Sequence, residues 1–175
     1  MQNIFWEIDG IKGESTSDQG KDMIELLQYS HSMTQPIDRN GSALGRAIGR
    51  VMHSDFTVTK YFDLASPILQ EKCCGGNNIK SMVLHVWKAD ATGKPVEYFT
   101  IGFAGCIISS IDISGSGDRP VETVSFNFQS IKWTYVQQDK EKGGKKGQAA
   151  ADDSASEAAS GSAASAAPPP ARKGA

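Results

Sequence analysis

The 175-residue sequence has few cysteines, no long apolar run and no excess of basic charge. Its three cysteines cannot all pair with one another and lack the spacing of a metal site, so we expect neither a disulfide framework nor a bound metal. No apolar run approaches the ~20 residues that span a bilayer, and no basic stretch leads an apolar segment at the N-terminus, so we expect no membrane insertion and no cleaved signal peptide. A net charge of −2 argues against nucleic acid as the main ligand.

The composition changes abruptly after residue 138. Residues 139–175 contain no aromatic side chain and no Val, Leu, Ile or Met. Such a segment has nothing large to bury, so it cannot offset an ordering cost of ~1–2 kcal/mol per residue. We therefore predict a folded domain over residues 1–138 and a disordered tail over residues 139–175, rich in Lys and Gly and then in Ala, Ser and Pro. Alanine would permit only a transient helix around residues 149–159.

Apolar and polar residues alternate through most of residues 1–138, which is typical of half-buried strands. The predicted strands are residues 3–8, 23–33, 56–62, 79–89, 95–103, 105–113 and 121–137. In the last of them the apolar face changes near Ile131, which indicates a bulge or a strand that crosses between sheets. In residues 23–33, the polar face carries Gln28, Ser30 and Ser32, and the other face carries Leu27, Tyr29, His31 and Met33.

One short helix interrupts the strands. Asp63 or Ser66 can cap it, Pro67 suits its first turn, and the glycines at positions 75 and 76 end it. Its inward-facing residues are expected to be Leu64, Ile68 and Leu69. The predicted fold class is all-β, a two-sheet barrel or sandwich with one short flanking α-helix and a long extended loop.

That long loop, residues 36–54, is called the arm. It is too long for an ordinary connection and too apolar for a solvated linker, so a second subunit would provide the burial that its own domain does not. The predicted subunit-interface residues are Leu44, Arg46, Ile48, Arg50, Val51 and Met52. We expect the apolar contacts to dominate, with the two arginines pairing with acids on the neighbour. The alternative is a mobile hairpin excursion.

No catalytic, cofactor-binding or metal site emerges from the sequence, so we predict a protein that is not an enzyme. His31, His53 and His85 lack the paired spacing of metal ligands and are interpreted as strand residues. Cys73 and Cys74 lie at the end of the predicted helix, and proximity to a helix C-terminus raises a thiol pKa. They and Cys106, at the start of a strand, are interpreted as structural. Residues 115–120 lead into a strand and form a turn, not a phosphate loop. What remains is a β-domain suited to self-assembly.

Several separate segments form one pattern, in order and with sensible spacing. They are residues 9–15 (DGIKGES), 29–33 (YSHSM), 56–63 (FTVTKYFD) followed by Ser66 and Pro67, 96–99 (VEYF), 117–122 (GDRPVE) and 124–128 (VSFNF). These segments resemble the haemolysin-coregulated protein (Hcp) family, the tube subunit of the type VI secretion system. Together they run through residues 3–138. The tail, residues 139–175, departs from the common core of the family.

The resemblance implies a β-barrel related to phage tail-tube proteins, with six copies closing into a ring. Rings would stack into a tube, which a contractile sheath expels together with a tip (VgrG-type) protein. The arm would reach an adjacent subunit or ring, and small effectors would lie in the lumen against Gln28, Ser30 and Ser32. The protein would be made in the cytoplasm and then secreted without a cleaved signal peptide, outside the cell or into a target cell.

Two other classes of function remain open. A carbohydrate-binding β-sandwich module would need a shelf of exposed aromatics, and Trp6, Trp87 and Trp133 lie in separate strand patterns. A thiol enzyme would use Cys73 or Cys74.

Overall fold

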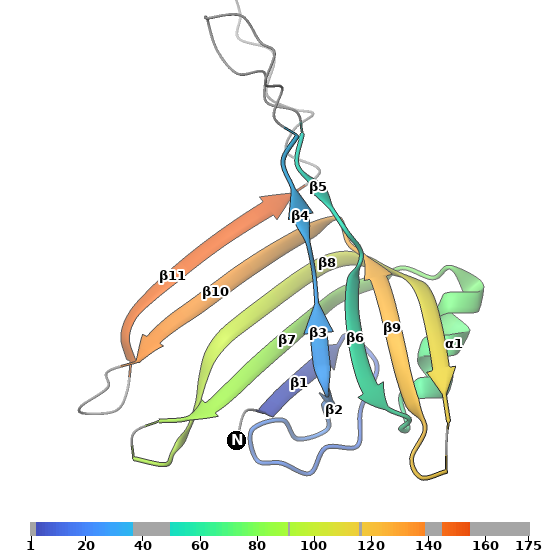
Figure 1. Cartoon of the computed structure of the whole chain (residues 1–175), viewed down its shortest axis with the longest axis horizontal. Helices are drawn as coiled ribbons and strands as arrows, with labels where there is room; N and C mark the ends of the chain where they lie inside the picture. Colours follow the sequence, from blue (N-terminus) through green and yellow to red (C-terminus); the bar gives the residue numbers. More distant parts are fainter. Residues whose placement is uncertain (1–2, 37–49, 91, 116, 139–144, 155–175) are drawn as a thin grey trace, which may run out of the picture.

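The computed structural model describes residues 3–36, 50–90, 92–115, 117–138 and 145–154. Its strands form two sheets that share one long strand, with a single helix, α1 (Ser66–Gly75), at the side (Figure 1). The predicted all-β class is confirmed, as an open sandwich and not a closed barrel. No helix in the described part of the chain is long and apolar enough to cross a membrane.

All strand pairs are antiparallel. The sheet called here the large sheet has the order β2 (Ile24–Glu25), β1 (Asn3–Ile8), β7 (Ile79–Ala89), the first half of β8 (Pro95–Ser114), β10 (Ser130–Gln138) and β11 (Lys145–Ser154). The small sheet has the order β3 (Gln28–Ser30), β6 (Phe56–Tyr61), β9 (Val121–Asn127) and the second half of β8. A separate ribbon of β4 (Met33–Thr34) and β5 (Met52–His53) projects at one end (Figure 1).

The strongest alternations gave the right strands. In β6 and β9, and in β7 from Met82 to Val86, every second residue is buried, as expected for strands with one face on the core. The single strand predicted over residues 23–33 is wrong, because this segment pairs successively with β1, β6 and β5 and therefore breaks into β2, β3 and β4. Leu27 and Met33, predicted to share a face with Tyr29, are 47% and 56% exposed.

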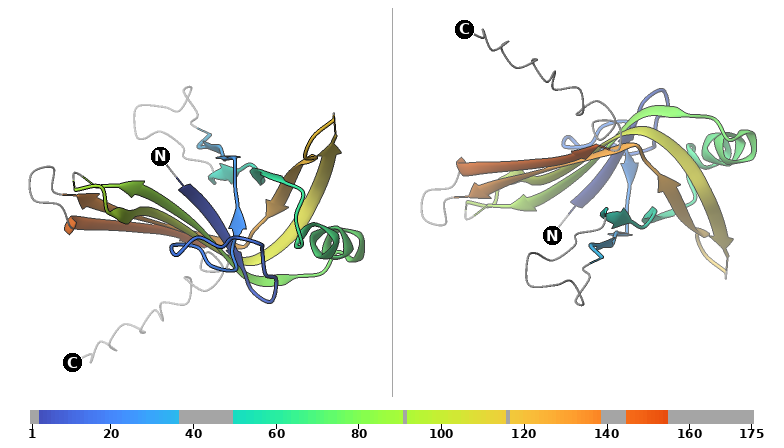
Figure 2. Two further views of the ribbon diagram at one scale, coloured as in Figure 1. Left: turned by 90° about the horizontal axis from the view of Figure 1, so that it is seen from below. Right: turned by 90° about the horizontal axis from the view of Figure 1, so that it is seen from above.

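Strand β8 passes from one sheet to the other. Its first half pairs with β7 and β10, and its second half pairs with β9. The chain after β8 also passes from one sheet to the other. Strand β9 pairs with the second half of β8 and β10 with the first half, and only residues 128–129 separate β9 from β10. Figure 2 shows the two sheets running apart from this bend. The crossing predicted near Ile131 is confirmed.

Gly105 lies at the bend of β8. Its φ is +62°, a left-handed conformation that costs an L-residue with a side chain about 1–2 kcal/mol. A Cβ at this position would also come 2.5 Å from the side chain of Gln129, which lies between β9 and β10. A glycine at position 105 therefore lets the bend of β8 lie close to the connection between β9 and β10.

We expect Gly105→Ala to lower the free energy of unfolding by about 2 kcal/mol or more, measured by denaturant unfolding. Gly102→Ala, in the same strand, is the matched control, because its Cβ would meet nothing within 4 Å and its φ is not positive. Adding Gln129→Ala to Gly105→Ala should recover the steric part of the loss and leave the backbone strain. Equal stabilities of the two single glycine variants would contradict this role for Gly105.

The core lies between the two sheets and is rich in aromatic rings. Phe126 of β9 stacks on Trp6 of β1, with ring centroids 5.5 Å apart, and meets Phe103 of β8 edge-on at 5.0 Å. Phe56 of β6 completes the group, 4.7 Å from Phe103. These four side chains are at most 3% exposed, so they join both sheets in one apolar cluster.

Helix α1 begins and ends close to its predicted bounds. Pro67 lies in its first turn, and Gly76 ends it with φ +58° and an N–H that donates to the carbonyl of Cys73. Only part of the predicted inward face is buried: Leu69 is fully buried, whereas Leu64 and Ile68 are 64% and 37% exposed. The helix packs along one side of β8, so only one narrow stripe of it meets the core.

The structure differs from the predicted boundary after residue 138, because β11 pairs with β10 along its whole length. Backbone hydrogen bonds to an open sheet edge hold this strand, so it needs none of the large apolar side chains whose absence predicted disorder. The helix envisaged within residues 149–159 is wrong for the part that β11 covers. The remaining tail residues, 139–144 and 155–175, lie outside the described residues.

Candidate functional site

The outer face of the small sheet carries hydroxyl and amide side chains. Strand register places Gln28 opposite Thr59 and Ser30 opposite Thr57, and these alternate with the buried residues of β6. Strand β9 extends the face, where Thr57 Oγ1 lies 2.9 Å from Ser125 Oγ. The hydroxyl face is defined as Gln28, Ser30, Thr57, Thr59, Thr123 and Ser125.

Two of the three predicted lumen-facing residues, Gln28 and Ser30, therefore share one face with four residues that the sequence analysis did not select. Ser32, the third, follows β3 and is exposed, and its amide N–H donates to Ser54 Oγ at 3.0 Å. The alternation within residues 56–62 and 121–137 was the signal that would have found the missing threonines and serine.

The predicted interface residues of the arm fall into two groups. Leu44, Arg46 and Ile48 lie outside the described residues. Arg50 is exposed, and Val51 and Met52, at the start of the returning strand β5, are 39% and 60% exposed. Met33 of β4, which was not selected, is 56% exposed on the same ribbon. The base of the arm thus presents apolar side chains to solvent in the isolated chain.

Two of the histidines meet beside this ribbon. His31 Nε2 lies 3.3 Å from His53 Nδ1, and His53 Nε2 lies 2.8 Å from the Asp153 carboxylate of β11. This contact could not be predicted from the sequence, because the two histidines are 22 residues apart and Asp153 was assigned to the tail. His85 contacts the carboxylates of Glu7 and Glu97 instead. No metal-binding group of three or more His, Cys, Asp or Glu occurs among the described residues.

The cysteines and tryptophans fit the alternatives poorly. Cys106 is fully buried, and this burial raises the pKa of its thiol to about 12. Cys73 is half-buried and Cys74 is exposed near the end of α1. Trp6 is fully buried, and Trp87 and Trp133 are half-buried in the large sheet, so these three rings do not form the exposed shelf that a carbohydrate module uses.

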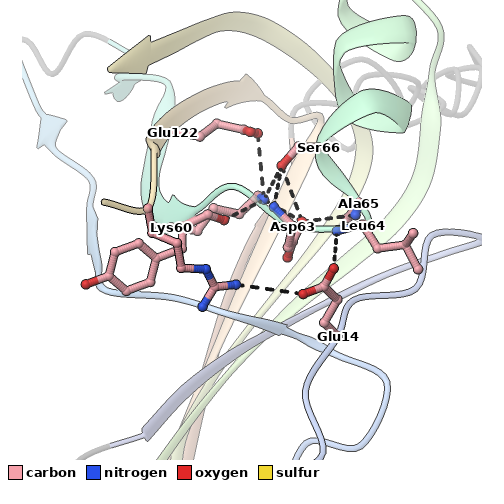
Figure 3. A network of polar contacts seen from close by, with 9 residues as sticks. Glu14, Lys60, Asp63, Leu64, Ala65, Ser66 and Glu122 are labelled. Carbon is pink, nitrogen blue, oxygen red and sulfur yellow. Dashed lines mark hydrogen bonds and ion pairs between the residues drawn. The ribbon is translucent and has the colours of Figure 1, made fainter. Parts of the chain in front are cut away.

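A buried lysine organises the other end of the sandwich (Figure 3). Lys60 is fully buried, and its Nζ donates to Asp63 Oδ1 at 2.7 Å and to Ser66 Oγ at 2.8 Å. The carboxylate of Glu122, also fully buried, lies 3.8 Å from the same Nζ. A buried ammonium needs such partners, because removing it from water is costly. Lys60 therefore ties β6 to β9 and to the start of α1.

Glu14 extends this network to the surface. One carboxylate oxygen accepts a hydrogen bond from the Leu64 N–H at 2.9 Å, and the other lies 3.7 Å from Arg119, whose guanidinium stands over the ring of Tyr61 (Figure 3). The residues of the network come from the segments 9–15, 56–63 and 117–122, together with Leu64 and Ser66. Segments far apart in the sequence therefore meet in one structural site. The site joins β6, β9 and the start of α1.

The comparison with protein families agrees with this architecture. Residues 5–135 match the family described as "Type VI secretion system effector, Hcp". The chain belongs to the Hcp family. This family is one of secreted structural proteins of type VI secretion and not a family of enzymes.

Three relatives illustrate the similarity. The structure of Hcp1 from Salmonella typhimurium is 32% identical, with a TM-score of 0.71 over 87% of this chain and 94% of that one. A type VI secretion system effector from Yersinia pestis is 30% identical, with a TM-score of 0.64 over 86% of this chain and 98% of that one. A protein of Pseudomonas aeruginosa named "Major exported protein" is 24% identical over 131 residues, which are 70% of this chain and 74% of its own length.

Proposed function

We propose that this Hcp-family chain is the tube subunit of a type VI secretion system. Six copies close into a ring, and rings stack into a tube that a contractile sheath expels with a tip protein. The subunit is made in the cytoplasm and secreted without a cleaved signal peptide. Membership of the Hcp family is the observation that carries this proposal. The name of the exported Pseudomonas relative supports secretion.

The edges of the small sheet support ring closure. In the described residues, β3 pairs with β6 alone, and residues 107–114 of β8 pair with β9 alone. Two different edges can meet head to tail between copies, and such a contact forms a ring when its rotation closes. The small sheets of successive copies would then line the lumen, with the hydroxyl face turned toward it. Small effector proteins would contact Gln28, Ser30 and Ser32 there.

The two ends of the sandwich support stacking. The β4–β5 ribbon, which leads into the arm, lies at one end, and the loop between β1 and β2 lies with the end of β6 at the other (Figure 1). This second end has a cleft of about 240 Å³, whose lining includes three acids, Glu14, Glu25 and Asp63, and one cation, Arg119. An arm that carries Arg46 and Arg50 would find acidic partners on such a surface of a neighbour.

The oligomeric mass in solution tests this proposal. We expect the chain to form a particle of six times its 18.7 kDa mass, measured by light scattering coupled to size exclusion. The double variant Leu44→Asp, Ile48→Asp should be a folded monomer, because burying two carboxylates in an apolar contact costs several kcal/mol per charge.

Lys80→Asp is the matched control, because Lys80 is exposed on β7 in the large sheet, outside both the arm and the loop between β1 and β2. It should leave the ring intact. Rings of unchanged mass in the double variant would overturn the role given to the arm. A monomeric wild-type chain at high concentration would overturn the ring itself.

A further inference from the structure

We propose that His31, His53 and Asp153 form a latch that holds the base of the arm against strand β11 at neutral pH and releases it in acid. These residues are called the latch. Its consequence for assembly depends on the proposed function, but the latch itself is a property of the single chain.

The latch joins three elements that are far apart in the sequence. His31 precedes β4, His53 belongs to β5, and Asp153 belongs to β11. The two imidazole planes lie within 7° of each other, with ring centroids 5.3 Å apart and the facing nitrogens at 3.3 Å. Near-parallel rings at this separation, with facing nitrogens in hydrogen-bond range, can share one proton.

Aromatic rings fix the two imidazoles in place. Phe128 meets both His31 and His53 edge-on, at 5.6 and 5.7 Å between centroids, and Trp133 of β10 stacks on His53 at 6.3 Å. The ring of Phe56 is tilted against that of His31, with 5.6 Å between centroids. The histidines therefore connect the ribbon to the point where β9 passes into β10, which is part of the rigid sandwich.

The hydrogen bonds of the latch require at least one unprotonated imidazole. With both rings neutral, His53 Nε2–H donates to Asp153, and His53 Nδ1 accepts from His31 Nε2–H. With one added proton on the pair, one ring can still donate and the other accept at this contact. With a second proton, two N–H groups face each other at the 3.3 Å contact, and two positive charges repel. The contact must then open.

The surroundings make the second proton hard to add. Burial, and then the nearby His53, lower the pKa of His31 from its ordinary value of 6.5. The folded latch thus binds fewer protons than the unfolded chain in mild acid. Its stabilising contribution is complete above about pH 6.5 and is lost as the pH falls through the lowered pKa of His31.

Other charged groups lie near the latch. Asp55 lines the same shallow depression as His31. Its hydrogen bonds from Asn127 and Ser109 lower its pKa, so it stays ionised through mild acid. Arg50 leads into β5, and Lys132 of β10 lies opposite Asp152 of β11. The Asp153 carboxylate contacts His53, and the Asp55 carboxylate lies near His31.

Hydrogen exchange tests the latch in the full-length chain. Protection factors are compared at pH 7.5 and pH 5.0, after correction for the intrinsic exchange rate at each pH. We expect protection of the β4, β5 and β11 amides to fall about tenfold or more at pH 5.0, as for the loss of one or more hydrogen bonds. Protection in β7, in the middle of the large sheet, should not change.

Two histidine variants make the test specific. His31→Gln keeps a side chain that can donate or accept a hydrogen bond but cannot charge, so protection of the ribbon should become independent of pH. His85→Gln is the matched control, since His85 pairs with Glu7 and Glu97 on the large sheet. In this variant, protection of the β4–β5 ribbon should fall at pH 5.0 as it does in the wild type. The latch would be overturned if protection of the ribbon amides did not change with pH in the wild type. It would also be overturned if their protection fell at pH 5.0 as much in His31→Gln as in the wild type.

The latch and the tube subunit can fail separately. The exchange data judge the latch, and the solution mass judges the ring. If the chain is a monomer and protection of its ribbon falls in acid, the ring proposal is wrong and the latch stands. If the chain forms a stable ring and protection of its ribbon does not depend on pH, the latch is wrong and the ring stands.

Discussion

Lys60→Met is expected to lower the free energy of unfolding by about 3–5 kcal/mol, measured by urea or guanidinium denaturation. Methionine fills a similar volume, so packing is largely kept. The change instead leaves the Glu122 carboxylate buried without its cation and deprives Asp63 and Ser66 of a donor. An uncompensated buried charge costs far more than the loss of an exposed ion pair.

Lys12→Met is the matched control for this prediction. Lys12 pairs with Asp22 at 3.4 Å, but both side chains are more than half exposed, so we expect a loss of about 0–1 kcal/mol. Combining Lys60→Met with Glu122→Leu should restore part of the lost stability, because the unpaired carboxylate is gone. Similar losses in the two methionine variants would show that Lys60 stabilises the fold no more than an exposed lysine does.

Phe126→Ala should lower the free energy of unfolding by about 3–5 kcal/mol, because it opens a cavity at the centre of the sandwich. This ring is fully buried and contacts aromatic rings from three other strands, β1, β6 and β8. The measurement is again denaturant unfolding, supported by the near-ultraviolet circular dichroism of the Trp6 environment.

Two variants bound the interpretation of Phe126→Ala. Phe126→Leu keeps most of the apolar volume and should lose clearly less stability. Tyr135→Ala removes a ring that is 47% exposed on β10, so we expect a much smaller loss. If Phe126→Ala cost no more than Tyr135→Ala, the aromatic cluster would not be the centre of the core.

Alternation in the sequence predicted those parts of the fold that depend on one buried face. The buried phenylalanine and valine of β6 and β9 follow this rule, and Lys60 and Glu122 occupy positions in the same alternation. The pattern therefore places both charges inside the core. It could not show that they meet, because their pairing depends on the register between β6 and β9, which sets Lys60 opposite Glu122.

The failures have a common physical cause, which is that backbone pairing leaves little trace in side-chain composition. Strand β11 consists of small and polar residues, and only the open edge of β10 makes it a strand. The latch likewise depends on β11, so it could not be inferred while this segment was expected to be disordered. In the same way, residues 23–33 look like one strand until their three successive partners are known.

The course of β8 has a mechanical consequence. A single covalent backbone runs through both sheets, and its neighbour β9–β10 follows it with one short interruption. A load applied along one sheet is therefore transferred to the other through peptide bonds and ladder hydrogen bonds acting in shear, and the side chains between the sheets need not carry it. A subunit pushed along its length would then move as one rigid unit, with little sliding of the small sheet against the large sheet.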